Sequence, residues 1–176
     1  MRIQYFSLNL LIVFVLLIGC NIEQKQDYFI KIIDGDFDEV GVESGYINSS
    51  GDTVISLGKY YYCYTDTFRN YAIVIDHKGI CIAIDKNEKE LFEVYWYDNG
   101  PDYIAEGLFR ILKDGKIGYA NKGGEIVIKP QFYCAFPFNN GKAKVSLECS
   151  SVEEGEHIRW ESDNWFFIDK SGQEIK

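Results

Sequence analysis

Histidine is scarce in this sequence, and the residue patterns that mark common catalytic and metal sites are missing. The two histidines are His77 and His157, and the cysteines are spread singly, with no Cys-x-x-Cys pair. A zinc site is therefore not expected. No G-x-S-x-G, H-E-x-x-H or phosphate-loop motif is present. Carboxylates are plentiful and could include a glycosidase-type pair, but the sequence gives no reason to choose one. We expect no catalytic activity and no cofactor.

Positive charge is also in short supply. The chain has 18 Lys and Arg against 27 Asp and Glu, which gives a formal net charge of −9. An acidic protein is repelled by the phosphates of nucleic acids, so no nucleic-acid partner is expected. The same repulsion opposes binding flat on a surface of anionic lipid.

Long hydrophobic runs are missing too, because the longest near the N-terminus is the nine-residue stretch Leu10–Ile18. A helix that crosses a bilayer needs about twenty apolar residues, so this run is too short to span one. Arg2 before the run and Gly19 after it are typical of a secretory signal peptide. The ending Leu-Ile-Gly-Cys resembles the bacterial lipoprotein box, in which the cysteine is acylated and becomes the first mature residue.

That resemblance implies a lipoprotein signal peptide at residues 1–19 and lipid attachment at Cys20. Residues 20–27 would then be the lipidated cysteine and a tether, and residues 28–176 a single folded domain. The lipid would be the protein's one contact with the membrane. Asn21 stands where an Asp would indicate retention in the inner membrane. The expected location is therefore the bacterial cell envelope, anchored in the outer membrane and facing either the periplasm or the outside.

Four cysteines remain after Cys20, namely Cys63, Cys81, Cys134 and Cys149. An oxidising compartment makes disulfides plausible among them. Four cysteines allow three pairings, and the sequence does not choose between these. Cys63 and Cys134 fall at equivalent repeat positions, about four strand spacings or roughly 19 Å apart in an open stack. We expect that these two do not pair with each other.

The chain contains an internal repeat. The segment "GYINSSGDTVI" (Gly45–Ile55) aligns with "GYANKGGEIVI" (Gly118–Ile128) at an offset of 73 residues. Between them, Gly79–Leu91 aligns with Gly115–Val127 at an offset of 36, so the first offset is about two periods. A fourth copy, Trp165–Ile175, ends the sequence. Such a fixed period indicates a repeat architecture.

Each unit has the pattern of a β-hairpin. Its apolar residues alternate with period two and are rich in Ile, Val, Tyr and Phe. Lys113–Lys116 contains Asp-Gly, which favours a two-residue type I′ turn, and Asn121–Gly124 predicts a second, looser turn. Gly118 within a strand predicts an aromatic ring from a neighbouring strand over its backbone. Pro130 predicts a strand end or an edge strand. We therefore predict an all-β domain of tandem β-hairpin repeats.

The third unit, "DGKIGYANKGGEIVIKPQFYCAFPFNNGKAKV" within Ile111–Val145, resembles the bacterial WG (KWG-type) repeat. In that pattern an aromatic-Gly pair and a turn precede Val-Ile-x-Pro, an aromatic residue, Phe-x-x-Gly and an alternating strand. The similarity extends over Val42–Leu147 and Trp165–Lys176, although Trp165 alone keeps the Trp. The resemblance implies an all-β WG-type repeat array, often found in secreted and lipid-anchored bacterial proteins. Repeat units bury their apolar faces on neighbours and leave an extended surface for partners.

Asp34, Asp36 and Asp38 have the odd-position spacing that opens an EF-hand calcium loop. However, Glu39 stands where the loop requires Gly, and Gly45 stands where a chelating Glu is needed. We therefore interpret the segment as an acidic, solvated turn.

An insertion at residues 148–164 breaks the period and contains His157, Arg159 and Trp160. A long loop on a repeat scaffold is a common place for binding, and Trp often dominates interface energies. These three residues are the candidate partner-binding residues. The alternative is a long hairpin with a charged tip whose Trp folds back on the sheet. Two aromatic-dense stretches, Tyr60–Phe68 and Glu93–Tyr103, are either exposed binding platforms or part of the core.

The function that these patterns favour is a lipid-anchored envelope protein with a non-catalytic β-repeat module for protein–protein interaction. Its partner would be an envelope or secreted protein, bound through aromatic anchors with acidic rims that steer a basic or polar surface. One alternative is a carbohydrate or envelope-glycan binding module, which predicts exposed coplanar rings flanked by Asp or Asn. A hydrolase is a further alternative and predicts a cleft with facing carboxylates or a His–carboxylate pair.

Overall fold

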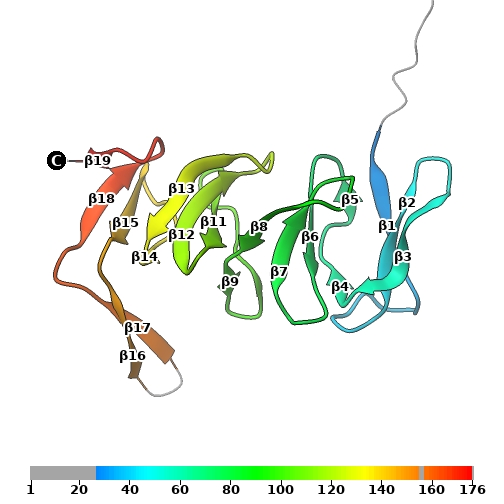
Figure 1. Cartoon of the computed structure of the whole chain (residues 1–176), viewed down its shortest axis with the longest axis horizontal. Helices are drawn as coiled ribbons and strands as arrows, with labels where there is room; N and C mark the ends of the chain where they lie inside the picture. The colour runs from blue at the N-terminus through cyan, green and yellow to red at the C-terminus, as the bar shows by residue number, and fades with distance from the viewer. Residues whose placement is uncertain (1–26, 155–156, 176) are drawn as a thin grey trace, which may run out of the picture.

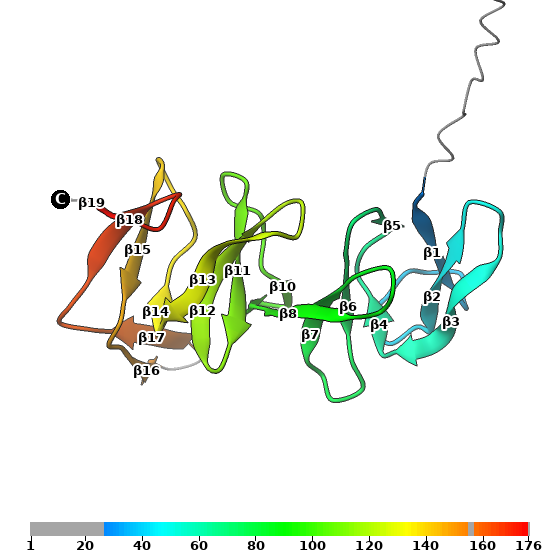
Figure 2. The same cartoon turned by 45° about the horizontal axis from the view of Figure 1, so that its top comes forward.

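The computed structural model describes residues 27–154 and 157–175. Within these ranges the chain consists of antiparallel strands and turns, without a helix. The small sheets follow one another in a row, from the N-terminal strands at one end to the C-terminal strands at the other (Figures 1 and 2). The prediction of an all-β fold built from hairpins is confirmed. The predicted signal peptide and Cys20 lie outside the described residues.

The first sheet has four strands in the order β3–β2–β1–β5. They are β1 (Phe29–Ile33), β2 (Ser44–Asn48), β3 (Thr53–Tyr60) and β5 (Thr67–Phe68). Phe29 on β1 lies opposite Phe68 on β5, and their rings meet edge to face with centroids 5.3 Å apart. The fully buried Tyr46 packs against the same Phe68 ring at 5.3 Å, so aromatic contacts fill this end of the core.

The central sheet has seven strands in the order β13–β12–β11–β8–β7–β6–β4. The strands are β4 (Tyr62–Cys63), β6 (Ala72–Ile75), β7 (Cys81–Ile84), β8 (Glu90–Val94), β11 (Leu108–Lys113), β12 (Lys116–Asn121) and β13 (Ile126–Phe132). Strands β9 (Trp96–Tyr97) and β10 (Gly100–Pro101) form a short pair in the connection from β8 to β11. Pro130 lies in β13, which is an edge strand, as Pro within a strand predicts.

The last sheet has the order β14–β15–β18–β19. Its strands are β14 (Cys134–Ala135), β15 (Lys142–Ser146), β18 (Phe166–Asp169) and β19 (Glu174–Ile175). Between β15 and β18 the chain makes a separate hairpin from β16 (Ser150–Glu154) and β17 (His157–Glu161). This hairpin extends away from the row of sheets in Figure 1.

Two connections carry the chain from one sheet into the next. Strand β3 pairs with β2 in the first sheet, and the following residues pair with β6 in the central sheet as β4. Strand β13 pairs with β12, and β14 then pairs with β15. At the two crossings the amides of Tyr61 and Tyr133 donate to the carbonyls of Ile75 and Ser146, at 2.9 and 3.0 Å. Each unit thus hydrogen-bonds to the next and leaves less open sheet edge.

The repeated glycines have a structural role that differs from the prediction. A Cβ added to Gly118 would lie 2.5 Å from the backbone nitrogen of Pro130, and one on Gly45 would lie 2.9 Å from that of Leu57. The expectation of an aromatic ring over Gly118 is therefore wrong, because the neighbouring strand's backbone fills that space. Both strand pairs have register shifts here, which bring the bulged strand inward. In the second unit Ile82 takes the glycine's place. It pairs with Glu93 with no register shift before Ala83, and the shift in this strand pair comes between Ala83 and Ile84.

The turns repeat as well. In the turn between β12 and β13, the Asn121 side-chain oxygen accepts the amides of Gly123 and Glu125, at 2.8 and 3.1 Å. The same two-bond pattern is made by the side-chain oxygens at Asn48, Asp76, Asp85 and Asp169. Such side chains satisfy turn amides and fix the loop. The predicted type I′ turn is also confirmed, because Asp114 and Gly115 have φ values of 53° and 70°.

Two buried tyrosines hold the units together. The Tyr46 hydroxyl donates to the carbonyl of Thr65, and the Tyr119 hydroxyl donates to that of Phe136, each at 2.7 Å. Tyr46 and Tyr119 are separated by the 73-residue offset of the sequence repeat. Burial raises the pKa of each hydroxyl, so both stay protonated and continue to donate. The rings therefore pack in the core while their polar ends are satisfied.

Candidate functional site: an aromatic groove beside the inserted hairpin

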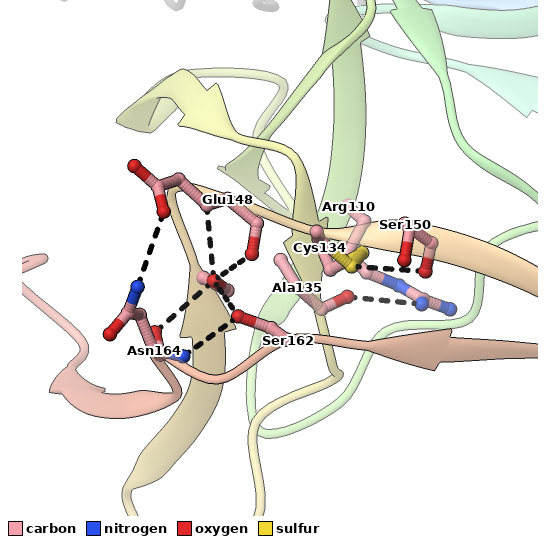
Figure 3. The surroundings of a disulfide bond; sticks show 9 residues. Arg110, Cys134, Ala135, Glu148, Ser150, Ser162 and Asn164 are labelled. Carbon is pink, nitrogen blue, oxygen red and sulfur yellow. Dashed lines mark hydrogen bonds between the residues drawn. A yellow bond between two sulfur atoms is a disulfide. The ribbon is translucent and has the colours of Figure 1, made fainter.

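A disulfide and a buried hydroxyl fix the base of the β16–β17 hairpin. Cys134 on β14 is bonded to Cys149, which immediately precedes β16 (Figure 3). The Ser146 hydroxyl oxygen lies 2.7 Å from the hydroxyl of Ser162 and within hydrogen-bond distance of the carbonyl oxygens of Glu148 and Asn164, at 2.7 and 3.1 Å. The segments that lead into and out of the hairpin both contact this serine.

The sequence left the pairing of the four cysteines open, and the structure shows the bond between Cys134 and Cys149. Cys63 and Cys81 are free and buried, which confirms that Cys63 and Cys134 do not pair. Burial raises the pKa of the Cys81 thiol to about 12, so this thiol remains protonated at neutral pH.

The hairpin places Trp160 against the body of the domain. Trp160 is half-buried, and its ring meets Tyr95 and Phe136 edge to face, with centroids 6.1 and 5.4 Å apart. Tyr97 and Tyr103 make a second edge-to-face pair at 5.7 Å. These five rings come from the β8–β11 connection, the chain after β14 and the inserted hairpin.

The rings surround a hollow of about 630 Å³, a size typical of a ligand-binding cleft. Arg110, Pro137, Ser151 and Arg159 complete its lining. A second hollow of about 480 Å³ shares Tyr103, Phe136 and Pro137 with the first. It continues to Phe138, Asn139, Asn140, Lys142, Lys144 and Phe167. We call the two adjoining hollows the aromatic groove.

Arg110 sets the geometry of the first hollow. Its side chain is buried with Asp102, and Nε and Nη2 donate to the two carboxylate oxygens at 3.0 and 2.5 Å. Nη1 donates to the carbonyl of Ala135 at 3.3 Å (Figure 3). The guanidinium lies 4.3 Å from the centroid of Tyr95 and 5.2 Å from that of Tyr97. One buried ion pair therefore positions two rings of the hollow through cation–π contacts.

The same ion pair folds the segment that carries those rings. The backbone amide of Arg110 donates to Asp102 at 2.8 Å, and the amide of Asp102 donates to the carbonyl of Tyr95 at 2.8 Å. The Tyr95 amide returns a bond to the carbonyl of Arg110 at 3.1 Å. Burial raises the pKa of the Tyr95 hydroxyl, which keeps this ring neutral.

Charge is distributed unevenly around the groove. Its lining includes four basic residues, Arg110, Lys142, Lys144 and Arg159, and neither Asp nor Glu. Three acidic residues of the insertion, Glu148, Glu161 and Asp163, line a different hollow of about 380 Å³. The acidic rim expected around the aromatic anchors is therefore found elsewhere, and the groove itself is basic.

The structure brings two of the three candidate residues of the insertion into the groove. Trp160 and Arg159 both line the first hollow, and Arg159 also donates to Glu161 at 2.7 Å. His157 pairs with Glu154 at the tip of the hairpin, and its side chain lies outside the described part of the molecule. The aromatic stretch Glu93–Tyr103 supplied a sequence signal for the groove, whereas nothing in the sequence singled out Arg110 or the two lysines.

The acidic segment after β1 has a carboxylate that is engaged by neighbouring side chains. Asp38 is paired with Lys31 and accepts a hydrogen bond from the hydroxyl of Tyr62 at 2.8 Å. Within residues 27–154 and 157–175, no three His, Cys, Asp or Glu side chains are grouped so that they could hold a metal ion. The same ranges contain no helix with the length and apolar character to cross a bilayer.

These observations define an all-β repeat protein with an aromatic groove. A family model described as "WG containing repeat" matches residues 117–148, which span β12 to β15. The third unit is thus similar to a WG repeat, as the resemblance predicted. Neither the curated proteins nor the solved structures include a significant match.

Proposed function

We propose that this protein is a lipid-anchored component of the bacterial cell envelope whose β-repeat domain is a non-catalytic module for binding another protein. The observation that carries the proposal is the convergence of five aromatic rings from three separate segments around one hollow. Aromatic residues held by packing and by a buried ion pair are preorganised, so little side-chain entropy is lost when a partner binds.

The size of the hollow suits one or two side chains of a protein partner. A buried aromatic side chain removes roughly 150–250 Å² from water. At about 25 cal/mol per Å², one such anchor contributes roughly 4–6 kcal/mol before the costs of association. Tyr97, Tyr103 and Phe136 are 50%, 52% and 40% exposed, so their ring surface is available for that contact.

Carbohydrate binding fits the geometry less well. Sugar rings stack on flat aromatic platforms, whereas the ring pairs around the first hollow are edge to face, with interplanar angles of 68–73°. Asn139 and Asn140 in the second hollow are the feature that favours a glycan. For hydrolysis, the described lining of the groove offers neither a carboxylate pair nor a histidine to act as acid and base.

The anchor is proposed from residues 1–20 alone. Metabolic labelling with an alkyne-bearing palmitate analogue tests it: the label is expected on the full-length chain and is expected to be lost in Cys20→Ala. The matched control is Cys81→Ala, which keeps Cys20 and is expected to retain the label.

Site-specific photo-cross-linking in cells tests the binding role. A photoreactive amino acid is placed at Tyr103 in the groove or, as the control, at Tyr61, which is 47% exposed and does not line it. We expect a discrete protein adduct from position 103 and none from position 61. An identical set of adducts from both positions, or no adduct from either, would contradict the proposal.

A further inference from the structure

The two lysines of strand β15 lie at the aromatic groove, and each contacts an aromatic ring. Lys142 and Lys144 have no ion-pair partner among the described residues. Instead, Lys142 lies 4.7 Å from the ring centroid of Phe167, and Lys144 lies 4.6 Å from that of Trp165. Both line the second hollow of the aromatic groove. Each of these two positive charges is thus held at the groove by an aromatic ring and is not neutralised by a carboxylate of the described residues.

Asp169 lies opposite Lys142 in the strand register but is engaged elsewhere. Its carboxylate accepts the amide and hydroxyl of Ser171, at 2.8 and 2.6 Å, and the amide of Gln173 at 3.0 Å. The bond from the Ser171 side chain, with those turn amides, holds the pKa of the Asp169 carboxyl below its usual range. The Asp169 carboxylate therefore serves its own turn, and it forms no ion pair with Lys142 in the described part of the chain.

The spacing of the lysines matches an extended peptide. Residues two apart on a strand project from the same face and are separated by about 7 Å. Two carboxylates at alternate positions of an extended peptide have the same separation and could face the two ammonium groups. Because the second hollow adjoins the first, a neighbouring apolar side chain of such a peptide could enter the ring-lined hollow.

The overall charge of −9 does not outweigh these local contacts. At physiological ionic strength the screening length is about 8 Å, so distant carboxylates of the domain act weakly on a ligand in the groove. Within that distance Asp102 is paired with Arg110 at 2.5 Å. Glu161 is likewise paired with Arg159 at 2.7 Å. The cations of the groove lining that have no ion-pair partner among the described residues are Lys142 and Lys144.

We infer that the groove binds an acidic peptide segment of its partner, with carboxylates at alternate positions on Lys142 and Lys144 and an aromatic or large apolar side chain in the hollow beside Trp160. This inference rests on the proposed role in protein binding and adds the chemical class of the partner. It reverses the expectation of a basic partner, because the lining of the groove contains Arg and Lys and neither Asp nor Glu.

A display library of random linear peptides, selected on the purified full-length chain, tests the inference. We expect the enriched peptides to carry Asp or Glu at alternate positions beside an aromatic residue. The double variant Lys142→Glu/Lys144→Glu is expected to bind these peptides about tenfold more weakly, since it converts two attractions into repulsions. The control is Lys89→Glu/Lys129→Glu, which changes the net charge equally at two exposed lysines outside the groove and is expected to bind as wild type does.

The outcomes separate the inference from the proposal on which it rests. An enriched peptide depends on the groove when Trp160→Ala abolishes its binding. If such peptides lack acidic residues, or bind the lysine variant as well as wild type, the acidic-peptide inference is overturned and the groove remains a protein-binding site. Peptides that bind Trp160→Ala unchanged, or the absence of any enriched peptide together with binding of polygalacturonate oligosaccharides, would overturn both. Thermal unfolding of each variant verifies that it is folded.

Discussion

Reduction of the Cys134–Cys149 disulfide is predicted to destabilise the C-terminal part of the domain. The bond joins β14 to the first residue before the inserted hairpin, with a sequence separation of 15 residues. When it is intact, the unfolded chain keeps a closed loop and has fewer conformations to gain. Breaking it releases that loop and also frees the base of the hairpin that carries Trp160.

The length of the closed loop sets how much stability is lost when the disulfide is reduced. Cross-linking residues 15 apart removes about 10 cal/mol/K of entropy from the unfolded chain, which corresponds to about 3 kcal/mol at 25 °C. With a urea dependence of about 2 kcal/mol per molar, the unfolding midpoint is expected to fall by about 1.5 M. The expected loss of about 3 kcal/mol is a substantial fraction of the usual free energy of unfolding of a domain, about 5–15 kcal/mol.

The assay is urea unfolding of the full-length chain followed by circular dichroism, with and without dithiothreitol. The variant Cys134→Ser/Cys149→Ser is the control, because it keeps the free Cys63 and Cys81 and has no bond to reduce. Reductant should lower the midpoint of the wild type and leave that of the variant unchanged. An unchanged midpoint in the reduced wild type would show that the disulfide does not stabilise the domain.

Three further predictions concern the repeat scaffold. Gly118→Ala is expected to cost about 1–3 kcal/mol in urea unfolding, because its Cβ meets β13 backbone, whereas Gly100→Ala, with open space, should change little. Arg110→Met should lower the free energy of unfolding by about 3–5 kcal/mol, because it leaves Asp102 buried without its partner. The double variant Asp102→Ala/Arg110→Met should recover much of that loss, whereas independent effects would add. The Lys31 ammonium lowers the pKa of Asp38, so this carboxylate stabilises the fold above its unfolded pKa near 3.8 and loses that effect as pH falls through its lower folded pKa. Asp38→Asn should therefore lose less stability than wild type between pH 5 and pH 2, and equal losses would contradict this.

Features that depend on adjacent residues could be predicted from the sequence. The type I′ turn follows from Asp114-Gly115, because both residues adopt positive φ readily. The alternating apolar residues correctly indicated strands, and the repeated "GY" segments correctly placed Gly45 and Gly118 at equivalent positions. Pro130 correctly indicated an edge strand.

Features that depend on how distant segments meet could not be predicted. The role of Gly118 was misjudged because a bulge in β13, and not a ring, occupies the space above it. The disulfide partner of Cys134 depends on where the insertion leaves β15. The groove unites Tyr97, Arg110 and Trp160, which are far apart in the sequence and individually resemble core or surface residues.

The most direct test of the groove as the binding site is to combine the photo-cross-linker at Tyr103 with a change in the hollow. Trp160→Ala removes a ring of the first hollow, and Trp96→Ala removes an exposed Trp that does not line the groove. With both variants verified as folded, the yield of the adduct is measured in cells. We expect Trp160→Ala to lose the adduct and Trp96→Ala to keep it; equal yields from the two variants would show that the groove is not the binding site.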